Sequence, residues 1–337
     1  MHKRVSLKDI AKEVGVSVAL VSYVINGQEK EKRVGAEVVK KIWKVAKELN
    51  YQPNQIALSL RMKSTKTIGL IVTDIANPFF GHLARIIENE SANHGYTLIF
   101  GSSEEDKNKS ETLINTLLNR QVDGFIIVPA EDSVQQIQNL ISRKIPLVLV
   151  DRYFPEVITS HIVLDNYQAT FDATSHLINE GYKYITMVAY KSSLIHMKER
   201  IRGYKEALES QNLAQNIKVI EISYNNCRED IENSFKDFTV KNKNTNAFLF
   251  ATNALSISGL YTIQKKCLKI PEDIAFIGFD GGESFDLFDP PLSFVQQPLD
   301  DMAKESFNVL MSLINGSNKI TQVMLSPTLM IRKSIGR

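Results

Sequence analysis

The first fifty residues space their apolar positions three and four apart, which is typical of amphipathic helices. The first stripe follows the capping residue Ser6 and comprises Leu7, Ile10, Ala11 and Val14. Gly15 can end this helix, and Ser17 can cap a second one whose inward face is Val21, Val24 and Ile25. A third stripe comprises Val38, Val39, Ile42, Val45, Ala46 and Leu49. Two short helices joined by a glycine-containing turn, with a third behind them, predict a helix-turn-helix over residues 1–49.

A short and isolated helical pattern follows the third stripe. Pro53 breaks the preceding helix, Asn54 can cap a new one, and Ile56, Ala57 and Leu60 would share a face. Because so short a helix is unstable alone in water, we expect it to order only against a second copy or a duplex. We therefore treat residues 50–65 as a hinge helix and linker.

From Thr67 onward the pattern changes to short, β-rich runs that alternate with helical periods. Nine such runs lie between Ile68 and Asp280, and they are followed by a helix over Leu299–Ile314 and a final strand over Val323–Lys333. Regular alternation of this kind predicts an α/β core of two doubly wound parallel sheets, with a ligand crevice at the carboxyl ends of the strands.

Polar residues stand where several predicted strands end: Asp74 and Asn77, Asp151 and Arg152, Asn253, and Asp280. Carboxylates and amides, with aromatic rings such as Phe79 and Phe80 nearby, are the groups that recognise sugar hydroxyls and stack on sugar rings. Each residue could instead cap the helix that follows it. Their recurrence at successive strand ends favours a binding site.

The composition indicates a globular protein that does not enter a membrane. The chain has 337 residues, 43% of them hydrophobic, and no segment is long and apolar enough for a membrane span or a signal peptide. We expect a cytoplasmic protein. Cys227 and Cys267 lack metal-ligand spacing and are expected to be buried free thiols, and the six histidines show no paired motif. The sequence thus predicts no metal, no cofactor and no catalytic residue.

The net charge of +2 conceals an asymmetry along the chain. Residues 1–66 contain 14 Lys and Arg against 6 Asp and Glu, a net charge of +8, which leaves −6 on the remainder. A basic head on an acidic body is typical of a polyanion-binding module joined to another domain, although surface lysines could equally serve solubility.

In a helix-turn-helix the start of the second helix enters the major groove of DNA. Val18, Ala19, Ser22 and Tyr23 are therefore the candidate base-reading residues, since apolar side chains can contact thymine methyl groups. Ser17, Ser22 and Asn26 are candidates for phosphate contacts.

Residues 6–61 resemble the DNA-binding head and hinge of the lactose-repressor/galactose-repressor family of bacterial transcription regulators. The matching strings are Leu7-Lys8-Asp9-Ile10-Ala11, Val14-Gly15-Val16-Ser17, Val21-Ser22-x-Val24-x-Asn26-Gly27, Arg33-Val34 and Tyr51-x-Pro53-Asn54-x-x-Ala57-x-x-Leu60. The resemblance extends the DNA-binding set to Ser6, Arg33, Tyr51, Asn54 and Ala57. It also implies that two copies of Leu60 wedge into the minor groove of a near-palindromic operator.

The head departs from the family pattern at its most informative position. Tyr23 stands where the family usually has a base-reading arginine, so the operator sequence cannot be borrowed from relatives. Gly35 replaces the usual serine cap of the third helix, and the loop between Asn26 and Val34 is longer and carries extra basic residues.

The body resembles the effector-binding core of the same family, which is akin to periplasmic sugar-binding proteins. The strings that carry the resemblance include Asn77-Pro78-Phe79-Phe80, Val150-Asp151-Arg152, Arg200-x-x-Gly203-Tyr204, Ala251-Thr252-Asn253 and Gly278-Phe279-Asp280. By resemblance, the effector cleft is lined by Asn77, Phe79, Phe80, Asp151, Arg200, Asn253 and Asp280. Ala254 stands where the family often has an acid, so no particular sugar is implied.

Three chain crossings, near Asp165, Phe294 and Val323, would divide residues 66–337 into two subdomains that can close on a ligand. The expected N-subdomain is about 66–164 and 294–322, and the C-subdomain about 165–293 and 323–337. No tetramerising helix follows, which indicates a homodimer.

The sequence therefore predicts an allosteric repressor that binds double-stranded DNA and a sugar-like effector. One alternative is a sugar-processing enzyme with a DNA-binding appendage, for which Asp151, Asp280 and Asp286 are conceivable acids and bases. Another, a sugar-binding transport component, is opposed by the intact DNA-binding head.

Overall fold

The computed structural model describes residues 5–51, 64–224, 226–235 and 246–336. The chain divides into two compact units, Met1–Thr65 and Lys66–Arg337. The hinge helix expected between residues 50 and 65, with Asn54, Ala57 and Leu60, lies outside the described residues.

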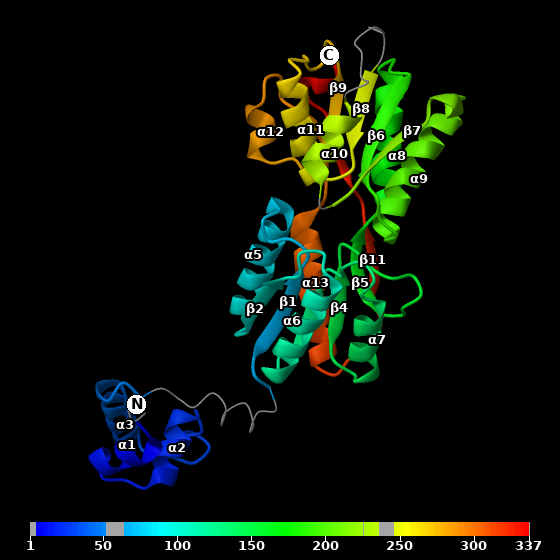
Figure 1. The fold of residues 1–337 in the computed structure, drawn as a ribbon. Helices are drawn as coiled ribbons and strands as arrows, with labels where there is room; N and C mark the ends of the chain where they lie inside the picture. The colour runs from blue at the N-terminus through cyan, green and yellow to red at the C-terminus, as the bar shows by residue number, and fades with distance from the viewer. Residues whose placement is uncertain (1–4, 52–63, 225, 236–245, 337) are drawn as a thin grey trace. The chain divides into compact units, whose positions relative to one another are not determined.

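Residues 5–51 of the first unit form the predicted bundle of three helices (Figure 1): α1 (Leu7–Val14), α2 (Val18–Ile25) and α3 (Ala36–Glu48). Ile10, Val21, Val24 and Ile42 are fully buried and form its core, so the three apolar stripes are confirmed. The Asp9 carboxylate accepts hydrogen bonds from both the backbone N–H and the hydroxyl of Ser6, which caps α1 as predicted.

The second unit contains two six-stranded sheets, each covered by helices (Figure 1). The sheet of the N-subdomain has the order β11-β5-β4-β3-β1-β2, and every pairing within it is parallel. Its strands are β1 (Thr67–Val72), β2 (Thr97–Ser102), β3 (Gly124–Ile127), β4 (Leu147–Val150), β5 (Ser160–Leu164) and β11 (Gln322–Leu325).

Four helices cover the N-subdomain sheet: α5 (Pro78–Asn93), α6 (Lys107–Asn119), α7 (Val134–Ser142) and α13 (Leu299–Ile314). Leu83 and Ile87 of α5 pack with Phe307 of α13 in one buried cluster. Ile114 of α6 and Leu140 of α7 belong to a second cluster. The sheet is therefore covered on both faces, which explains why β3 and β4 are fully buried and continuously apolar.

The sheet of the C-subdomain has the order β12-β10-β9-β8-β6-β7 and is parallel except for β12. Its strands are β6 (Tyr184–Tyr190), β7 (Lys218–Ile222), β8 (Asn246–Phe250), β9 (Ala275–Phe279), β10 (Ser293–Gln296) and β12 (Thr328–Met330). Its helices are α8 (Asn166–Asn179), α9 (Ile195–Ser210), α10 (Cys227–Ser234), α11 (Asn253–Lys265) and α12 (Glu283–Leu287), with short 3₁₀ turns η1 (Ala214–Asn216) and η2 (Lys333–Ile335).

Two of the three predicted crossings lie later in the chain than expected. The first is where predicted, since β5 and α8 meet at Asp165. Phe294, however, is inside β10 of the C-subdomain sheet, and Val323 is inside β11 of the N-subdomain sheet. The predicted final strand Val323–Lys333 is wrong, because the chain leaves one sheet after Leu325 and pairs in the other from Thr328. A continuous apolar pattern does not reveal that two short strands belong to different sheets.

The two cysteines differ from the buried thiols that we expected. Both are free, but Cys227 is only partly buried and Cys267 is exposed. Cys267 follows the end of α11 with a φ of 55°, so it occupies the turn that ends the helix rather than its packed face.

Candidate functional site

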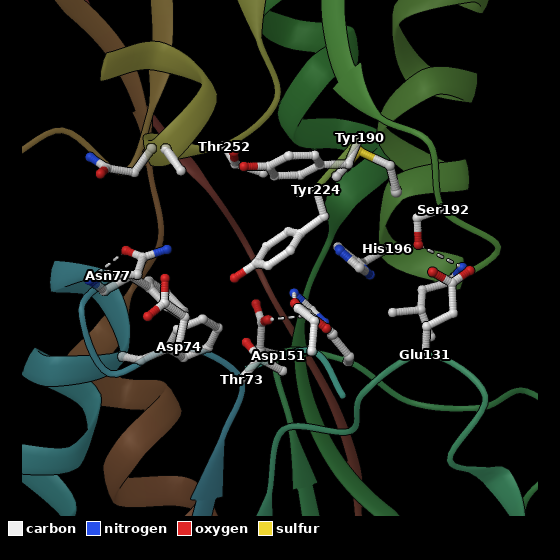
Figure 2. A pocket seen from close by; sticks show the side chains of 18 of the residues that line it. Thr73, Asp74, Asn77, Glu131, Asp151, Tyr190, Ser192, His196, Tyr224 and Thr252 are labelled. Carbon is white, nitrogen blue, oxygen red and sulfur yellow. Dashed lines mark hydrogen bonds and ion pairs between the residues drawn. The ribbon is translucent and has the colours of Figure 1, made fainter. Parts of the chain in front are cut away.

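A cavity of about 600 Å³ lies where the carboxyl ends of both parallel sheets face each other. All seven residues predicted from the sequence to line the effector cleft line this cavity: Asn77, Phe79, Phe80, Asp151, Arg200, Asn253 and Asp280. Figure 2 shows Asn77, Asp74 and Asp151 projecting from the N-subdomain, and Tyr190 and Tyr224 facing them from the C-subdomain. The size and the mixture of polar and aromatic groups suit a small organic ligand.

Arg200 reaches the cavity from α9 and is only 3% exposed. Its Nε donates to the Oδ1 of Asn166 at 2.7 Å, and its Nη1 donates to the carbonyl oxygen of Ala251 at 2.5 Å. The guanidinium also lies 3.8 Å above the centre of the Phe279 ring. Burial lowers the pKa of Arg200 to about 10, so it remains a cation at neutral pH. Within the described residues, Nη2 keeps no acceptor and can serve a ligand.

The sequence around Arg200 explains how the helix holds it. A Cβ at Gly203 would lie 2.2 Å from the carbonyl oxygen of Tyr167, so only glycine lets α9 approach α8 this closely. The hydroxyl of Thr170 on α8 donates to the carbonyl oxygen of Arg200 at 2.7 Å. The hydroxyl of the fully buried Tyr204 donates to the carbonyl oxygen of Ile185 at 2.6 Å and fixes α9 on the sheet. The Arg-x-x-Gly-Tyr string is therefore one structural unit.

Asp280 follows β9 in the left-handed conformation, with a φ of 53°. Its Oδ2 accepts a hydrogen bond from the Nε2 of Gln297 at 2.9 Å, and its carbonyl oxygen accepts one from the Nδ2 of Asn253 at 2.7 Å. Loss of solvation raises the pKa of Asp280 to about 7, although the Arg200 cation opposes the rise. The cavity thus contains a carboxyl group whose pKa lies close to neutral pH.

Asp151 and Arg152 form a charged layer at the opposite wall. The two Nη atoms of Arg152 pair with the Glu105 carboxylate at 2.8 and 2.7 Å, and its Nε lies 3.4 Å from the Oδ2 of Asp151. Burial raises the pKa of Asp151, and the neighbouring arginines oppose this. Because Arg152 is already paired bidentately, it has little capacity left for an anionic ligand.

Among the described residues that line the cavity, three have a buried side-chain atom without a hydrogen-bond partner: Thr73 Oγ1, His196 Nδ1 and Gln297 Oε1. Burial, together with Arg152 and Arg200, holds the pKa of His196 well below its ordinary value, so its ring is neutral. A buried polar atom without a partner costs about 1–3 kcal/mol. Because protein atoms cover them almost completely, these side chains would have to turn toward the cavity before a ligand could pair with them.

The strand-end pattern in the sequence identified some of the residues that line the cavity but not others. Tyr190 ends β6, Tyr224 follows β7, and Gln297 follows β10, so each stands where a strand ends. His196 precedes Arg200 by one helical turn, a spacing that places both on the same face of α9. Phe79 and Phe80 pack edge to face at 5.0 Å and are 5% and 4% exposed, so they belong mainly to the core behind the cavity.

In the first unit, the start of α2 presents the side chains that were predicted to read bases. Val18, 39% exposed, and Ala19 are at its solvent surface, and the Ser17 hydroxyl accepts a hydrogen bond from the backbone N–H of Leu20 at 3.2 Å. The Nδ2 of Asn26 donates to the hydroxyl oxygen of Ser22 at 3.0 Å.

The other proposed DNA contacts in this unit have different surroundings. Tyr23 is partly buried, and the Nζ of Lys32 lies 5.8 Å from the centre of its ring. Arg33 is exposed, whereas Tyr51 packs against the hydrophobic core and Ser6 caps α1. Val18 and Ala19 are therefore the most accessible members of the proposed base-reading set.

The described part of the chain offers no cluster of three or more His, Cys, Asp or Glu that could hold a metal ion. Among the same residues, no helix has the length and apolar character needed to cross a bilayer.

Residues 65–334 match the family described as periplasmic binding proteins and sugar binding domain of LacI family, and residues 6–54 match bacterial regulatory proteins of the lacI family. The chain is 30% identical over 334 residues to the HTH-type transcriptional repressor PurR of Aliivibrio fischeri strain MJ11, with 98% of both chains covered.

Two solved structures are also similar. The lac repressor dimer bound to operator and the anti-inducer ONPF has a TM-score of 0.86 at 22% identity and covers 99% of both chains. A LacI transcriptional regulator from Alkaliphilus metalliredigens QYMF, complexed with D-xylulofuranose, has a TM-score of 0.70 at 27% identity over 80% of this chain and 98% of that one.

Proposed function

Because the chain belongs to the LacI family of bacterial regulatory proteins, and is thus a DNA-binding repressor under effector control, we propose that its effector is an uncharged polyhydroxyl compound such as a sugar. The observation that carries this proposal is the convergence of Arg200, Asp280, Asp151 and Asn253 on one cavity. Carboxylates accept from sugar hydroxyls, and guanidinium and amide groups donate to them.

The charges around the cavity support an uncharged ligand. Seven carboxylates line it against three cations: Asp74, Glu104, Glu105, Asp106, Glu131, Asp151 and Asp280 against Arg152, Lys191 and Arg200. Asn77, Asp106 and Thr252 cap α5, α6 and α11, which begin at this wall, and each accepts from one or two of the first N–H groups. α9 also begins here, without a side-chain cap. Because like charges repel, the excess of carboxylates disfavours a phosphate. We expect sugar phosphates to bind poorly.

For DNA, the proposal assigns base reading to Val18, Ala19, Ser22 and Tyr23, and backbone contacts to Ser17, Asn26 and the basic loop that ends at Arg33. The exposure of Val18 and Ala19 at the start of α2 supports this assignment. Asn54, Ala57 and Leu60 keep their proposed roles in the hinge. Ser6 and Tyr51 remain in the DNA-binding set, with the additional structural roles described above.

A homodimer in the cytoplasm is the proposed acting species, since a two-fold symmetric protein matches a near-palindromic operator. The lac repressor, similar over the whole chain, is a dimer on its operator. The protein is a regulator and not an enzyme. Asp286, the third acid of the enzyme alternative, lies outside the residues that line the cavity and pairs with Arg332 at 3.0 Å.

A thermal-shift screen tests the effector class. The purified chain is screened with mono- and disaccharides, sugar phosphates and nucleobases, with and without operator DNA selected from a random duplex pool. A neutral sugar that stabilises wild type but not Arg200→Ala supports the proposal. Stabilisation by a sugar phosphate or a nucleobase, and by none of the neutral sugars, would refute it.

A further inference from the structure

A short connection in the C-subdomain crosses the cleft and packs into the N-subdomain. It joins β6 to α9 through residues 191–194, which we call the strap. Leu194 of the strap is 5% exposed and belongs to a hydrophobic cluster whose other buried members all come from residues 71–157 of the N-subdomain. The C-subdomain thus contributes one apolar side chain to the core of its neighbour.

A polar contact adjoins this apolar one. Glu131, which follows β3 in the N-subdomain, accepts a hydrogen bond from the backbone N–H of Ser193 at 2.6 Å and another from the Ser193 hydroxyl. Both donors belong to the strap. Glu131 also lines the cavity, as do Lys191, Ser192 and Leu194. In Figure 2, Glu131 and Ser192 stand together at one end of the cavity, opposite Asn77.

The strap leads directly into the helix that carries two residues of the cleft. α9 begins at Ile195, immediately after Leu194, and presents His196 and Arg200 to the cavity. Whatever holds the start of α9 against the N-subdomain therefore fixes these two side chains relative to Asp151. The interactions of Leu194 and Ser193 involve protein atoms alone and require no ligand.

We propose that Glu131 and Leu194 are positioning residues: together they hold the strap across the cleft without ligand, so that Arg200 faces Asp151 before an effector arrives. The role of the strap in regulation rests on the proposed function. The contacts that form the strap are present in the ligand-free core and do not depend on it. A cleft that is already held at one end loses less freedom when it binds, which favours tight binding of a small ligand. The strap also closes that end of the cavity and limits ligand length.

The test is a distance measurement in the ligand-free, full-length protein. Spin labels are attached through p-acetylphenylalanine at Gln138 on α7 and Lys205 on α9, two exposed positions, so both natural cysteines stay unchanged. Pulsed electron spin resonance then gives the distribution of distances across the cleft. Wild type should give one narrow population. Leu194→Ala and Glu131→Ala should each add a second population with a longer distance between the labels. In Glu131→Gln, which keeps an acceptor oxygen, this second population should be smaller than in Glu131→Ala.

Matched variants separate opening from simple destabilisation. Leu140→Ala removes the same volume from the same cluster, but from α7 of the N-subdomain itself. Glu104→Ala removes another acid of the cavity wall, whose ion pair with Lys109 stays within its own subdomain. Both controls should keep the single narrow population. If Leu194→Ala fails to fold, the partly exposed Glu131 still carries the test.

If wild type, Glu131→Ala and Leu194→Ala give the same distribution of label distances, the proposed role of the strap is wrong. The same holds if Leu140→Ala broadens the distribution as much as Leu194→Ala does. Ligand affinity provides a separate readout. If a strap variant leaves a third to a tenth of the molecules closed, its affinity for the sugar found by screening falls about 3–10-fold. Should no neutral sugar bind wild type, the proposed function fails, while the distance measurement still decides the strap.

Discussion

The carboxyl group of Asp280 gives a test that needs no ligand. Burial raises its pKa from an ordinary value of 3.8 to about 7. Because the folded-state pKa lies above that of an unfolded chain, protonated Asp280 stabilises the fold at low pH, and this contribution disappears as the pH rises through about 7. Between pH 5 and pH 8 the loss is about 2.5 kcal/mol, which solvent around the partly exposed residue reduces to about 1–2 kcal/mol.

Asp280→Asn removes the ionisation and keeps a side-chain oxygen that can accept from Gln297. Urea unfolding of wild type and variant at pH 5, 6, 7 and 8 isolates the effect, since every other titrating group is common to both. Wild type should lose about 1–2 kcal/mol relative to the variant across this range. Asp286→Asn, whose carboxylate is 58% exposed, controls for the loss of an acid at the surface. If the difference in free energy of unfolding between wild type and Asp280→Asn stays constant from pH 5 to pH 8, the Asp280 carboxylate is not desolvated as proposed.

The same ionisation should govern ligand affinity. A carboxyl group with a pKa of about 7 is mostly protonated at pH 6 and mostly ionised at pH 8. If sugar hydroxyls donate to the ionised form, affinity should fall about tenfold from pH 8 to pH 6. Isothermal titration calorimetry measures this directly. Asp280→Asn should bind the sugar more weakly, and its affinity should not change between pH 8 and pH 6. If the affinity of the variant still falls over this range, another group causes the pH dependence.

Four further predictions concern the helix that holds Arg200 and the two DNA-binding elements. Arg200→Ala should abolish the ligand response while operator affinity without ligand stays at the wild-type value, as measured by fluorescence anisotropy; a retained response would remove Arg200 from the site. Gly203→Ala places a Cβ 2.2 Å from the carbonyl oxygen of Tyr167 and should destabilise the core by about 1–3 kcal/mol in urea unfolding, with a weaker ligand response because α9 must shift. An unchanged stability would mean that α8 and α9 separate freely. Leu60→Ala should weaken operator binding and leave ligand binding intact, and equal loss of both would indicate a folding defect. Ser17→Ala should destabilise the head by about 0.5–2 kcal/mol through loss of the α2 cap, which thermal unfolding of the head can measure; no change would mean that the cap is dispensable.

The sequence predicted helices and parallel strands well because each carries a local signal. Ser6 and Asp9 cap α1 as their spacing indicates, and the helix predicted over Leu299–Ile314 has the bounds found in the structure. The strands around β3 and β4 are continuously apolar because both faces of the sheet are covered. Periodicity reports local burial, so it could not show that β11 and β12 pair in different sheets.

Site residues could be predicted from the sequence where a polar side chain directly follows an apolar strand. Contacts between segments that are far apart in the sequence could not. Asp151 and Asp280 follow apolar strands and were found by that rule. The pairing of Arg152 with Glu105 joins residues 47 positions apart, and the contact of Ser193 with Glu131 joins residues 62 apart. Neither pair has a local signature. Resemblance to a family supplied Arg200, whose place on a helix would otherwise indicate a solvated surface charge.

One titration measures the coupling between the effector cleft and operator binding. Operator duplex selected by the protein from a random pool is titrated with wild type and with Arg200→Ala, in the absence and presence of saturating sugar, at fixed salt. We predict that the sugar changes wild-type operator affinity about 5–150-fold and leaves that of Arg200→Ala unchanged. If a sugar binds the wild-type cleft, as measured by calorimetry, without changing operator affinity, the cleft and the DNA-binding head are not coupled.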